Sequence, residues 1–249
     1  MIENEQNRIA NDLVLIGGGH SHLILIMQFS KKTIQGTRIT LISDEMDIPY
    51  SGMIPGFIEG TYSWRESHID LYKLTQRLNI RFINSKVIKI SSKNKEVYLN
   101  DRPTIKFDIL SINSGIQSNY NNIKGAKKYC VPVKPISRLA NNFFNEIKDT
   151  NAIAFIGGGA GAVELALALR KRYIIDKPHL KITIITGKNG LLSSFPKQTK
   201  QTSKNALKKV SIDIIENTEV VEVKHNKIIM SDKKTLNIDK CILSTNAMA

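Results

Sequence analysis

The sequence LVLIGGGHSHLILI, residues 13–26, decides how the chain is expected to fold. Four aliphatic residues predict a buried strand, three glycines follow directly, and an apolar segment over about 20–32 has the character of a helix. A second strand is predicted at RITLIS, residues 38–43. Strand, glycine turn, helix and strand make a βαβ unit, whose parallel strands require a right-handed crossover and a sheet covered on both faces.

The chain contains this arrangement twice. Three pairs of segments match in the same order: VLIGGGHSH at 14–22 with AFIGGGAGA at 154–162, INSKVIKI at 83–90 with ENTEVVEV at 216–223, and ILSIN at 109–113 with ILSTN at 242–246. Matches that keep their order indicate a duplicated unit of about half the chain. We therefore predict an α/β protein with two Rossmann-like dinucleotide-binding units, each carrying a strand-rich insertion.

The second glycine segment fits the dinucleotide fingerprint, with Gly157, Gly159 and the permitted Ala162. The first glycine allows a tight turn, and the second lets the backbone approach a pyrophosphate at the positive end of the helix. The residues predicted to bind the cofactor here are Gly157, Gly158, Gly159, Ala160 and Gly161.

The first glycine segment departs from the fingerprint at its third position, where His22 replaces Gly or Ala. The imidazole must either push the helix outward or point sideways and find hydrogen-bond partners, and we favour a partly buried packing histidine. His20 is the better candidate for contact with a phosphate or ribose. The residues predicted to bind the cofactor here are Gly17, Gly18, Gly19, His20 and Ser21.

An acid that binds a ribose 2′-hydroxyl is expected at the end of the second strand of each unit. Asp44 has this position in the first unit, where it could hold an adenosine ribose. The second unit has Thr186-Gly187-Lys188 and no acid. Lys188 could contact the 2′-phosphate of NADPH, although an exposed turn lysine is the simpler interpretation in so lysine-rich a chain.

Composition narrows the classes of partner and compartment. The net charge of +14 would suit nucleic acid, but the lysines are scattered and not interleaved with aromatics, so no nucleic-acid partner is expected. The polar, acidic start and the shortness of the apolar runs, compared with the roughly 20 residues of a membrane span, favour a cytoplasmic protein. Cys130 and Cys241 have no redox or zinc spacing, so we interpret both as small core residues, with a reactive thiol as the alternative.

The two glycine units, the second reading GGGAGAVELALAL, resemble the two-dinucleotide-binding flavoproteins of the pyridine nucleotide-disulfide oxidoreductase superfamily. The resemblance implies an FAD-binding domain at residues 1–125, a linker at 126–150 and an NAD(P)H-binding domain at 151–249. It also implies that Glu164 lies near the nicotinamide and flavin rings as the catalytic candidate, and its apolar neighbours suggest that it is buried.

The absence of a cysteine pair favours a resemblance to the type II NADH dehydrogenase branch. GGGHSHL, DIPYSGMIPGFIEGTYSW, HIDLYKL, DILSINSG and VPVKPI further resemble the flavoprotein domain that is fused to selenide, water dikinase. By that resemblance Ser51 and Gly52 lie near the flavin ring, Asn113, Ser114 and Gly115 contact FAD at a strand end, and Lys134 approaches the active site. No metal ligands are expected.

The predicted function is an FAD-dependent NAD(P)H oxidoreductase that passes a hydride from NAD(P)H to FAD and then electrons to a small acceptor such as a quinone. The alternative is a non-catalytic nucleotide-binding or regulatory module linked to selenium metabolism. Peripheral contact with the inner face of the membrane and a homodimer are compatible with this prediction. In the family the chain returns to complete the FAD domain, and here the sequence stops at ILSTNAMA, where that return would begin.

Overall fold

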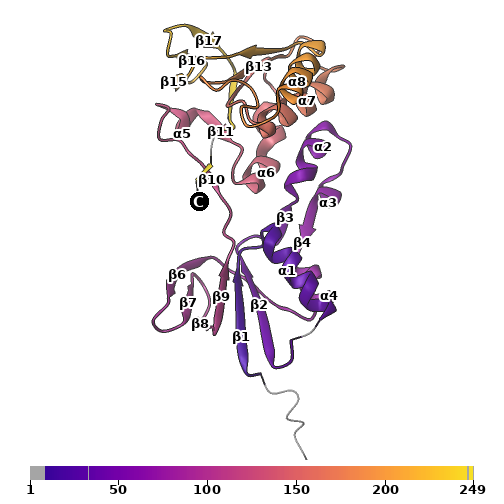
Figure 1. Ribbon diagram of the computed structural model, residues 1–249, viewed down its shortest axis with the longest axis vertical. Coiled ribbons are helices and arrows are strands. Elements are labelled where there is room, and N and C mark those ends of the chain that lie inside the picture. The colour runs from indigo at the N-terminus through magenta and orange to yellow at the C-terminus, as the bar shows by residue number, and fades with distance from the viewer. Residues whose placement is uncertain (1–8, 33, 246, 249) are drawn as a thin grey trace, which may run out of the picture. The chain divides into compact units, whose positions relative to one another are not determined.

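The computed structural model describes residues 9–32, 34–245 and 247–248. The chain divides into two compact units, which are described separately (Figure 1). Unit 1 contains the chain up to Ile48 together with His68–Gly115, and unit 2 contains Pro49–Ser67 together with the chain from Ile116 onward. Strands β3 (Asp47–Pro49) and β4 (His68–Asp70) pair where the chain leaves unit 1 and rejoins it. Which unit holds which cofactor remains a prediction.

Unit 1 is built on a parallel sheet in the order β5-β2-β1-β9. Its strands are β1 (Asn11–Ile16), β2 (Thr37–Ser43), β5 (Arg81–Asn84) and β9 (Ile109–Ile112). Alternate residues of β1 face opposite sides, as a strand requires. Leu13 and Leu15 pack with helices α1 (His20–Lys31) and α4 (Leu71–Arg77). Val14 and Ile16 pack with an antiparallel sheet of β6 (Val87–Ser91), β7 (Glu96–Leu99) and β8 (Ile105–Lys106).

Unit 2 repeats this plan with one further strand, in the order β11-β18-β12-β13-β14. The strands of this parallel sheet are β11 (Cys130–Pro132), β12 (Ala152–Ile156), β13 (Lys181–Ile185), β14 (Ile212–Ile215) and β18 (Lys240–Leu243). Helices α6 (Ile136–Ile147), α7 (Ala160–Tyr173) and α8 (Lys197–Lys209) contribute to the core on one face. Helix α5 (Ala126–Tyr129) and the sheet of β15 (Val220–Lys224), β16 (Lys227–Met230) and β17 (Thr235–Asn237) contribute to the core on the other. A short antiparallel pair joins β10 (Gln117–Ser118) to β19 (Ala247–Met248).

The two units confirm the predicted fold class and the duplication. The order β5-β2-β1-β9 corresponds to β14-β13-β12-β18, and each small sheet begins with the same irregularity, after Val87 in unit 1 and after Val220 in unit 2. These two valines match in the predicted alignment. An extra residue in one strand of a pair is a feature of the backbone that a duplicated ancestor would pass to both copies.

One predicted match, between ILSIN and ILSTN, is wrong by two residues. The parallel pairing places Ile16 beside Ile112 in unit 1 and Ile156 beside Leu243 in unit 2, so Ile112 and Leu243 are counterparts. Because side chains alternate with a period of two, a shift of two residues keeps the inward and outward pattern and leaves no trace in hydrophobicity. Asn246, the predicted counterpart of Asn113, lies outside the described residues.

Two stretches of chain that we did not assign to the second unit pack within it. Residues 49–67 form η2 (Ser51–Met53), α2 (Ile54–Glu59) and α3 (Trp64–Ser67). The Phe57 ring meets Phe144 edge to face at 5.4 Å, and Lys171 of α7 forms an ion pair with Glu59. Residues 126–150, expected to be a linker, fold as α5, β11 and α6, because α6 buries an amphipathic stripe that includes Leu139 and Phe143.

A buried arginine connects the end of α7 to the sheet of unit 2. Arg170 is 6% exposed, and its Nη2 donates to the carbonyl oxygens of Leu180 at 2.6 Å and Ser211 at 3.2 Å. These two carbonyls immediately precede β13 and β14. Burial lowers the pKa of the guanidinium, while the nearby charge of Asp213 opposes that change. Arg170 therefore fixes where the helix lies along the sheet.

Candidate dinucleotide-binding sites

The carboxyl edge of the unit 2 sheet carries an open glycine loop. Gly157 follows β12 with φ of +113°, and its N–H donates to the carbonyl of Ile185 at 2.9 Å. A Cβ at this position would lie 2.5 Å from the carbonyl oxygen of Ser244, which no side chain tolerates. Gly159 caps α7, and a Cβ there would meet nothing within 4 Å. The first glycine is therefore required by the fold, whereas the open space at Gly159 admits a ligand at the positive end of the helix.

The corresponding loop of unit 1 is more crowded. Gly17 has φ of +89°, donates to the carbonyl of Ile42 at 2.7 Å, and lies so near β9 that a Cβ would be 2.1 Å from the carbonyl oxygen of Asn113. Gly19 caps α1, and a Cβ there would be 2.5 Å from Nδ2 of Asn113. The Asn113 side chain thus stands beside the start of α1, where it can contribute an amide to whatever the loop binds.

His22 confirms the prediction of a packing histidine with both ring nitrogens engaged. It is 2% exposed, its Nδ1 lies 2.7 Å from the carbonyl oxygen of Gly17, and its Nε2 lies 2.9 Å from Oγ of Ser111. A carbonyl oxygen only accepts, so Nδ1 carries a proton and donates to Gly17. In the neutral ring Nε2 then accepts from the Ser111 hydroxyl. The imidazole thereby connects the glycine loop, α1 and β9.

The register explains why unit 1 accommodates a histidine at this position. Ser111 pairs with Leu15 in unit 1, and Ile242 pairs with Phe155 in unit 2, so Ser111 and Ile242 are counterparts. His22 with Ser111 therefore replaces Ala162 with Ile242, both of which are fully buried. In unit 1 the large residue, His22, is on the helix and the small one, Ser111, is on the strand. In unit 2 the small residue, Ala162, is on the helix and the large one, Ile242, is on the strand. At this one position the helix contacts the sheet through hydrogen bonds in unit 1 and through aliphatic packing in unit 2.

Most of the residues predicted to bind a cofactor in unit 1 meet at the carboxyl edge of its sheet. His20 and Ser21 begin α1 and are exposed, Asp44 follows β2 and is exposed, and Asn113 follows β9, whose successors Ser114 and Gly115 are also exposed. In open parallel sheets ligands bind in this position, outside the carboxyl ends of the strands. The contacts that these residues make with a ligand remain predictions.

In unit 2 an acid lies beside the position where the sequence has none. Gly187 is the counterpart of Asp44, and a Cβ there would lie 3.4 Å from Cγ and 4.0 Å from Oε1 of Glu219. The neighbouring Lys188 is exposed. Glu219 could not be predicted for this position, because it comes from the loop before β15 and not from the end of β13. No local pattern gives that proximity.

A second carboxylate at this edge has a structural role. Glu216 follows β14 and accepts hydrogen bonds from Nζ of Lys204 at 2.6 Å and from the backbone N–H of Leu191 at 3.1 Å. The hydrogen bond from Lys204 is the main cause that holds the pKa of Glu216 below its ordinary value. Through these two hydrogen bonds, Glu216 connects α8 to the turn after β13.

The structure tests the predicted burial of Glu164 but not the predicted contacts of Ser51, Gly52 and Lys134 with the cofactors. Glu164 lies on α7 with its side chain exposed, so the expectation that its apolar neighbours bury it is wrong, since they occupy the other faces of the helix. Ser51 and Gly52 begin the excursion of residues 49–67 within unit 2 and are exposed. Their proximity to a flavin ring remains a prediction, as does the approach of Lys134, which follows β11.

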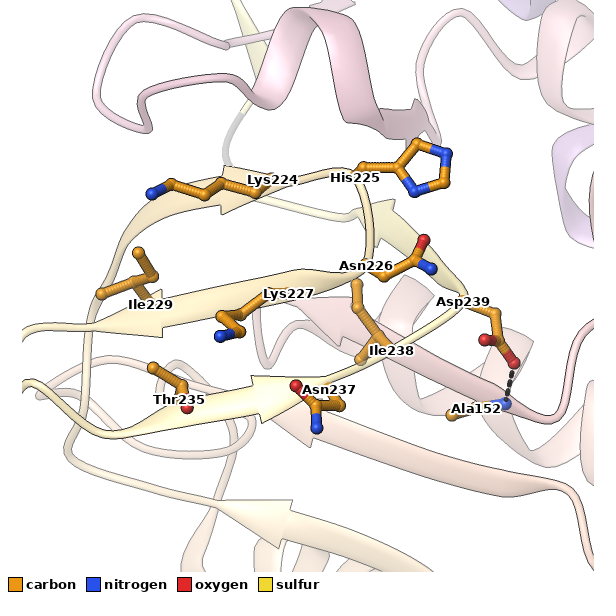
Figure 2. A pocket seen from close by; sticks show the side chains of 10 residues that line it. All are labelled: Ala152, Lys224, His225, Asn226, Lys227, Ile229, Thr235, Asn237, Ile238 and Asp239. Carbon is orange, nitrogen blue, oxygen red and sulfur yellow. Dashed lines mark hydrogen bonds between the residues drawn. The ribbon is translucent and has the colours of Figure 1, made fainter.

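Unit 2 also has a pocket of about 700 Å³, and Figure 2 shows the side chains that line it. Lys224, His225 and Asn226 line it at one hairpin, and Asp239 accepts hydrogen bonds from the backbone N–H groups of Asn151 and Ala152. Ala152 begins β12 and the glycine loop follows its end, so the two places are separated by the length of the strand, roughly 16 Å. The pocket is therefore not the dinucleotide site.

Two further observations concern the described residues alone. They contain no group of three or more His, Cys, Asp or Glu side chains that could hold a metal ion. None of the helices in this part of the chain is long and apolar enough to cross a membrane.

Two Rossmann-type units, each with a glycine loop at the carboxyl edge of its sheet, define a protein with two dinucleotide-binding folds. The chain belongs to the pyridine nucleotide-disulphide oxidoreductase family, whose model matches residues 11–245. This result confirms the superfamily that the sequence resembles.

Similar proteins agree with this assignment. The NADH dehydrogenase-like protein YutJ of Bacillus subtilis is 25% identical over 88% of this chain and 61% of its own length. The type II NADH:quinone oxidoreductase of Staphylococcus saprophyticus is 24% identical over 84% of this chain and 57% of its own. The structure of NDH2 from Plasmodium falciparum in complex with NADH superposes with a TM-score of 0.81 at 20% identity, covering 95% of this chain and 55% of that one. The chain thus spans just over half the length of these relatives.

Proposed function

We propose that the chain forms the two dinucleotide-binding units of an FAD-dependent NAD(P)H oxidoreductase, with FAD in unit 1 and NADH or NADPH in unit 2. The observation that carries the proposal is the pair of equivalent glycine loops. In each, the first glycine has a positive φ and lies against the strand-end carbonyl that follows β9 or β18. Two of the similar proteins are named as an NADH dehydrogenase-like protein and a type II NADH:quinone oxidoreductase.

The residues fit these cofactors. In unit 2 the empty space at Gly159 and the start of α7 can receive a pyrophosphate. In unit 1 the backbone of Gly17, Gly18 and Gly19 would hold the pyrophosphate of FAD, with Asp44 at the adenosine ribose and Asn113 beside the helix start. When both cofactors are bound, the nicotinamide supplies a hydride and the flavin passes electrons on.

The contribution of this chain is to position the cofactors. We assign the exposed Glu164, one helical turn after Ala160, to contact with the cofactor rings, and Ser51, Gly52, Ser114 and Gly115 to the flavin. A quinone is the proposed acceptor, because a relative bears that activity in its name. The proposed link to selenide, water dikinase depends only on the sequence motifs. The proposed contact with a membrane surface depends on the proposal that the acceptor is a quinone.

The first test is the visible spectrum of the purified chain, loaded with FAD, before and after anaerobic addition of NADH or NADPH. Bleaching of the flavin absorption supports the oxidoreductase. A chain that binds NAD(P)H but never takes up flavin would contradict the proposal and leave a nucleotide-binding module.

Gly159→Ala tests the assignment of unit 2 without disturbing the fold. The added methyl group meets no protein atom within 4 Å, and φ at this residue is −77°, so we expect the free energy of unfolding to change by no more than about 1 kcal/mol. The methyl group would stand where the pyrophosphate approaches, so NAD(P)H affinity should fall about tenfold or more while FAD affinity is unchanged. Titration calorimetry with each nucleotide measures both. Equal NAD(P)H binding by variant and wild type would exclude this loop.

A further inference from the structure

The two cysteines of the chain, distant in sequence, are direct neighbours in the unit 2 sheet. Cys130 of β11 pairs with Cys241 of β18 in parallel register. Paired residues of neighbouring strands point to the same face. Both side chains belong to the apolar cluster beneath the small sheet β15-β16-β17. The interpretation of the cysteines as core residues is right for Cys241, but it missed their proximity.

The spacing of the pair suits a disulfide. Adjacent strands lie about 4.8 Å apart, which falls within the roughly 4.4–6.8 Å between Cα atoms that a disulfide spans. The two thiols already interact, because the hydrogen bond with Cys130 is the first cause that raises the pKa of Cys241, followed by burial. The raised pKa of Cys241 favours the protonated thiol at this buried position.

Exposure distinguishes the two sulfurs. Cys241 is fully buried, whereas Cys130 is partly exposed at the start of β11, an edge strand of three residues. A thiolate that solvent reaches is the one that oxidants attack, and a buried neighbour in contact is placed to resolve the product.

We propose that Cys130 and Cys241 form a redox-active dithiol that hydrogen peroxide converts to an intramolecular disulfide. The Cys130 thiolate attacks one peroxide oxygen, the O–O bond breaks, and the hydroxide that leaves takes up a proton to form water. The Cys241 sulfur then attacks the sulfenic sulfur of Cys130, the S–S bond forms, and the departing hydroxide leaves as water with the Cys241 proton. Two thiols are oxidised by two electrons in all, and one peroxide is reduced to two waters.

The disulfide would act on the strand that supports the nucleotide loop. Cys241 is three residues before Ser244, whose carbonyl lies against Gly157. Because Cys130 is partly exposed, a small dithiol can reach the bond and should reduce it readily. The site therefore suits reversible oxidation better than permanent cross-linking.

The test measures thiols in the full chain by mass. The reduced protein is treated with a small excess of hydrogen peroxide, unfolded, alkylated with N-ethylmaleimide and weighed intact. We expect two adducts before oxidation and none after it, a mass lower by 2 Da, a tryptic cross-link between the two cysteine peptides, and recovery of both thiols with dithiothreitol.

Single variants give the order of events. Cys241→Ala retains the accessible sulfur and should accumulate a sulfenic acid at Cys130 that dimedone traps, whereas Cys130→Ala should leave Cys241 unreacted in the folded chain. Sulfinic acid at Cys130 of the wild type without a cross-link would overturn the proposal, and so would disulfides only between chains or a bond that dithiothreitol fails to reduce. The wild-type measurement stands even where a variant does not fold.

Discussion

Exchanging His22 and Ser111 for the residues of the second unit tests how the first helix is held on its sheet. His22→Ala removes the imidazole and its two hydrogen bonds of 2.7 and 2.9 Å, worth about 1 kcal/mol each. It also leaves the partly buried Gly17 carbonyl without this partner, at a cost of about 1–3 kcal/mol. We therefore expect unit 1 to lose about 2–4 kcal/mol. Ser111→Ile alone presses a larger side chain against the imidazole and should cost about 1–3 kcal/mol.

The double variant His22→Ala with Ser111→Ile recreates the Ala162 and Ile242 pair and should be more stable than the sum of the single effects by at least about 1 kcal/mol. Native-state hydrogen exchange of peptides from β1 and α1 reports on unit 1 and excludes the second unit from the measurement. Protection of the α8 peptides should not change in any of the three variants. Strict additivity, or a double variant less stable than both singles, would refute the idea that the two pairs are equivalent.

Three further outcomes follow from unit 2. Arg170→Met removes the two hydrogen bonds to the carbonyls that precede β13 and β14, and should destabilise unit 2 by about 2–4 kcal/mol. Urea unfolding followed by the fluorescence of the single tryptophan measures this loss. Unchanged stability would contradict the role of Arg170 in fixing α7 on the sheet. The lowered pKa of Glu216 stabilises the fold above the ordinary glutamate pKa and ceases to do so as pH falls through the lowered value. Glu216→Gln should therefore cost stability at pH 7 and progressively less below about pH 4.5, and a constant difference would argue against the ion pair with Lys204. Lys188→Ala should lower the ratio of NADPH affinity to NADH affinity, and Glu219→Gln should raise that ratio, each by about three- to tenfold. Titration calorimetry with both nucleotides measures the ratio. A ratio that neither variant changes would show that neither side chain lies at the ribose site.

The sequence was sufficient for the architecture because both units repeat a local pattern. Strand, glycine turn and helix are consecutive in the chain, so hydrophobic spacing and three glycines predicted β1 with α1 and β12 with α7. Helix α6 was missed although Leu139, Phe143 and Ile147 have helical spacing, because the prolines before it suggested a linker. That signal was present and could have been found.

Side-chain neighbours across strands were harder to predict, since they depend on which strands pair and in what register. The proximity of Cys130 to Cys241 follows from β11 joining the edge of the sheet, and the partner of His22 follows from the register of β9. Alternation along a strand limits which residues face inward, but it does not select among partners two residues apart. Both findings required the fold.

The two glycine loops show how one motif can serve two ligands. Each unit begins its helix with the same three glycines, so the motif alone predicts equal sites. The strand-end neighbour differs: Asn113 places an amide beside Gly19, whereas Ser244 leaves the space at Gly159 empty. Phosphate binding requires only the turn and the helix start, which both units keep, so selection between cofactors falls to residues at the ends of the other strands. We propose Asp44 in one unit and the opposed charges of Lys188 and Glu219 in the other as those residues, and their difference supports the proposed assignment of a different nucleotide to each unit.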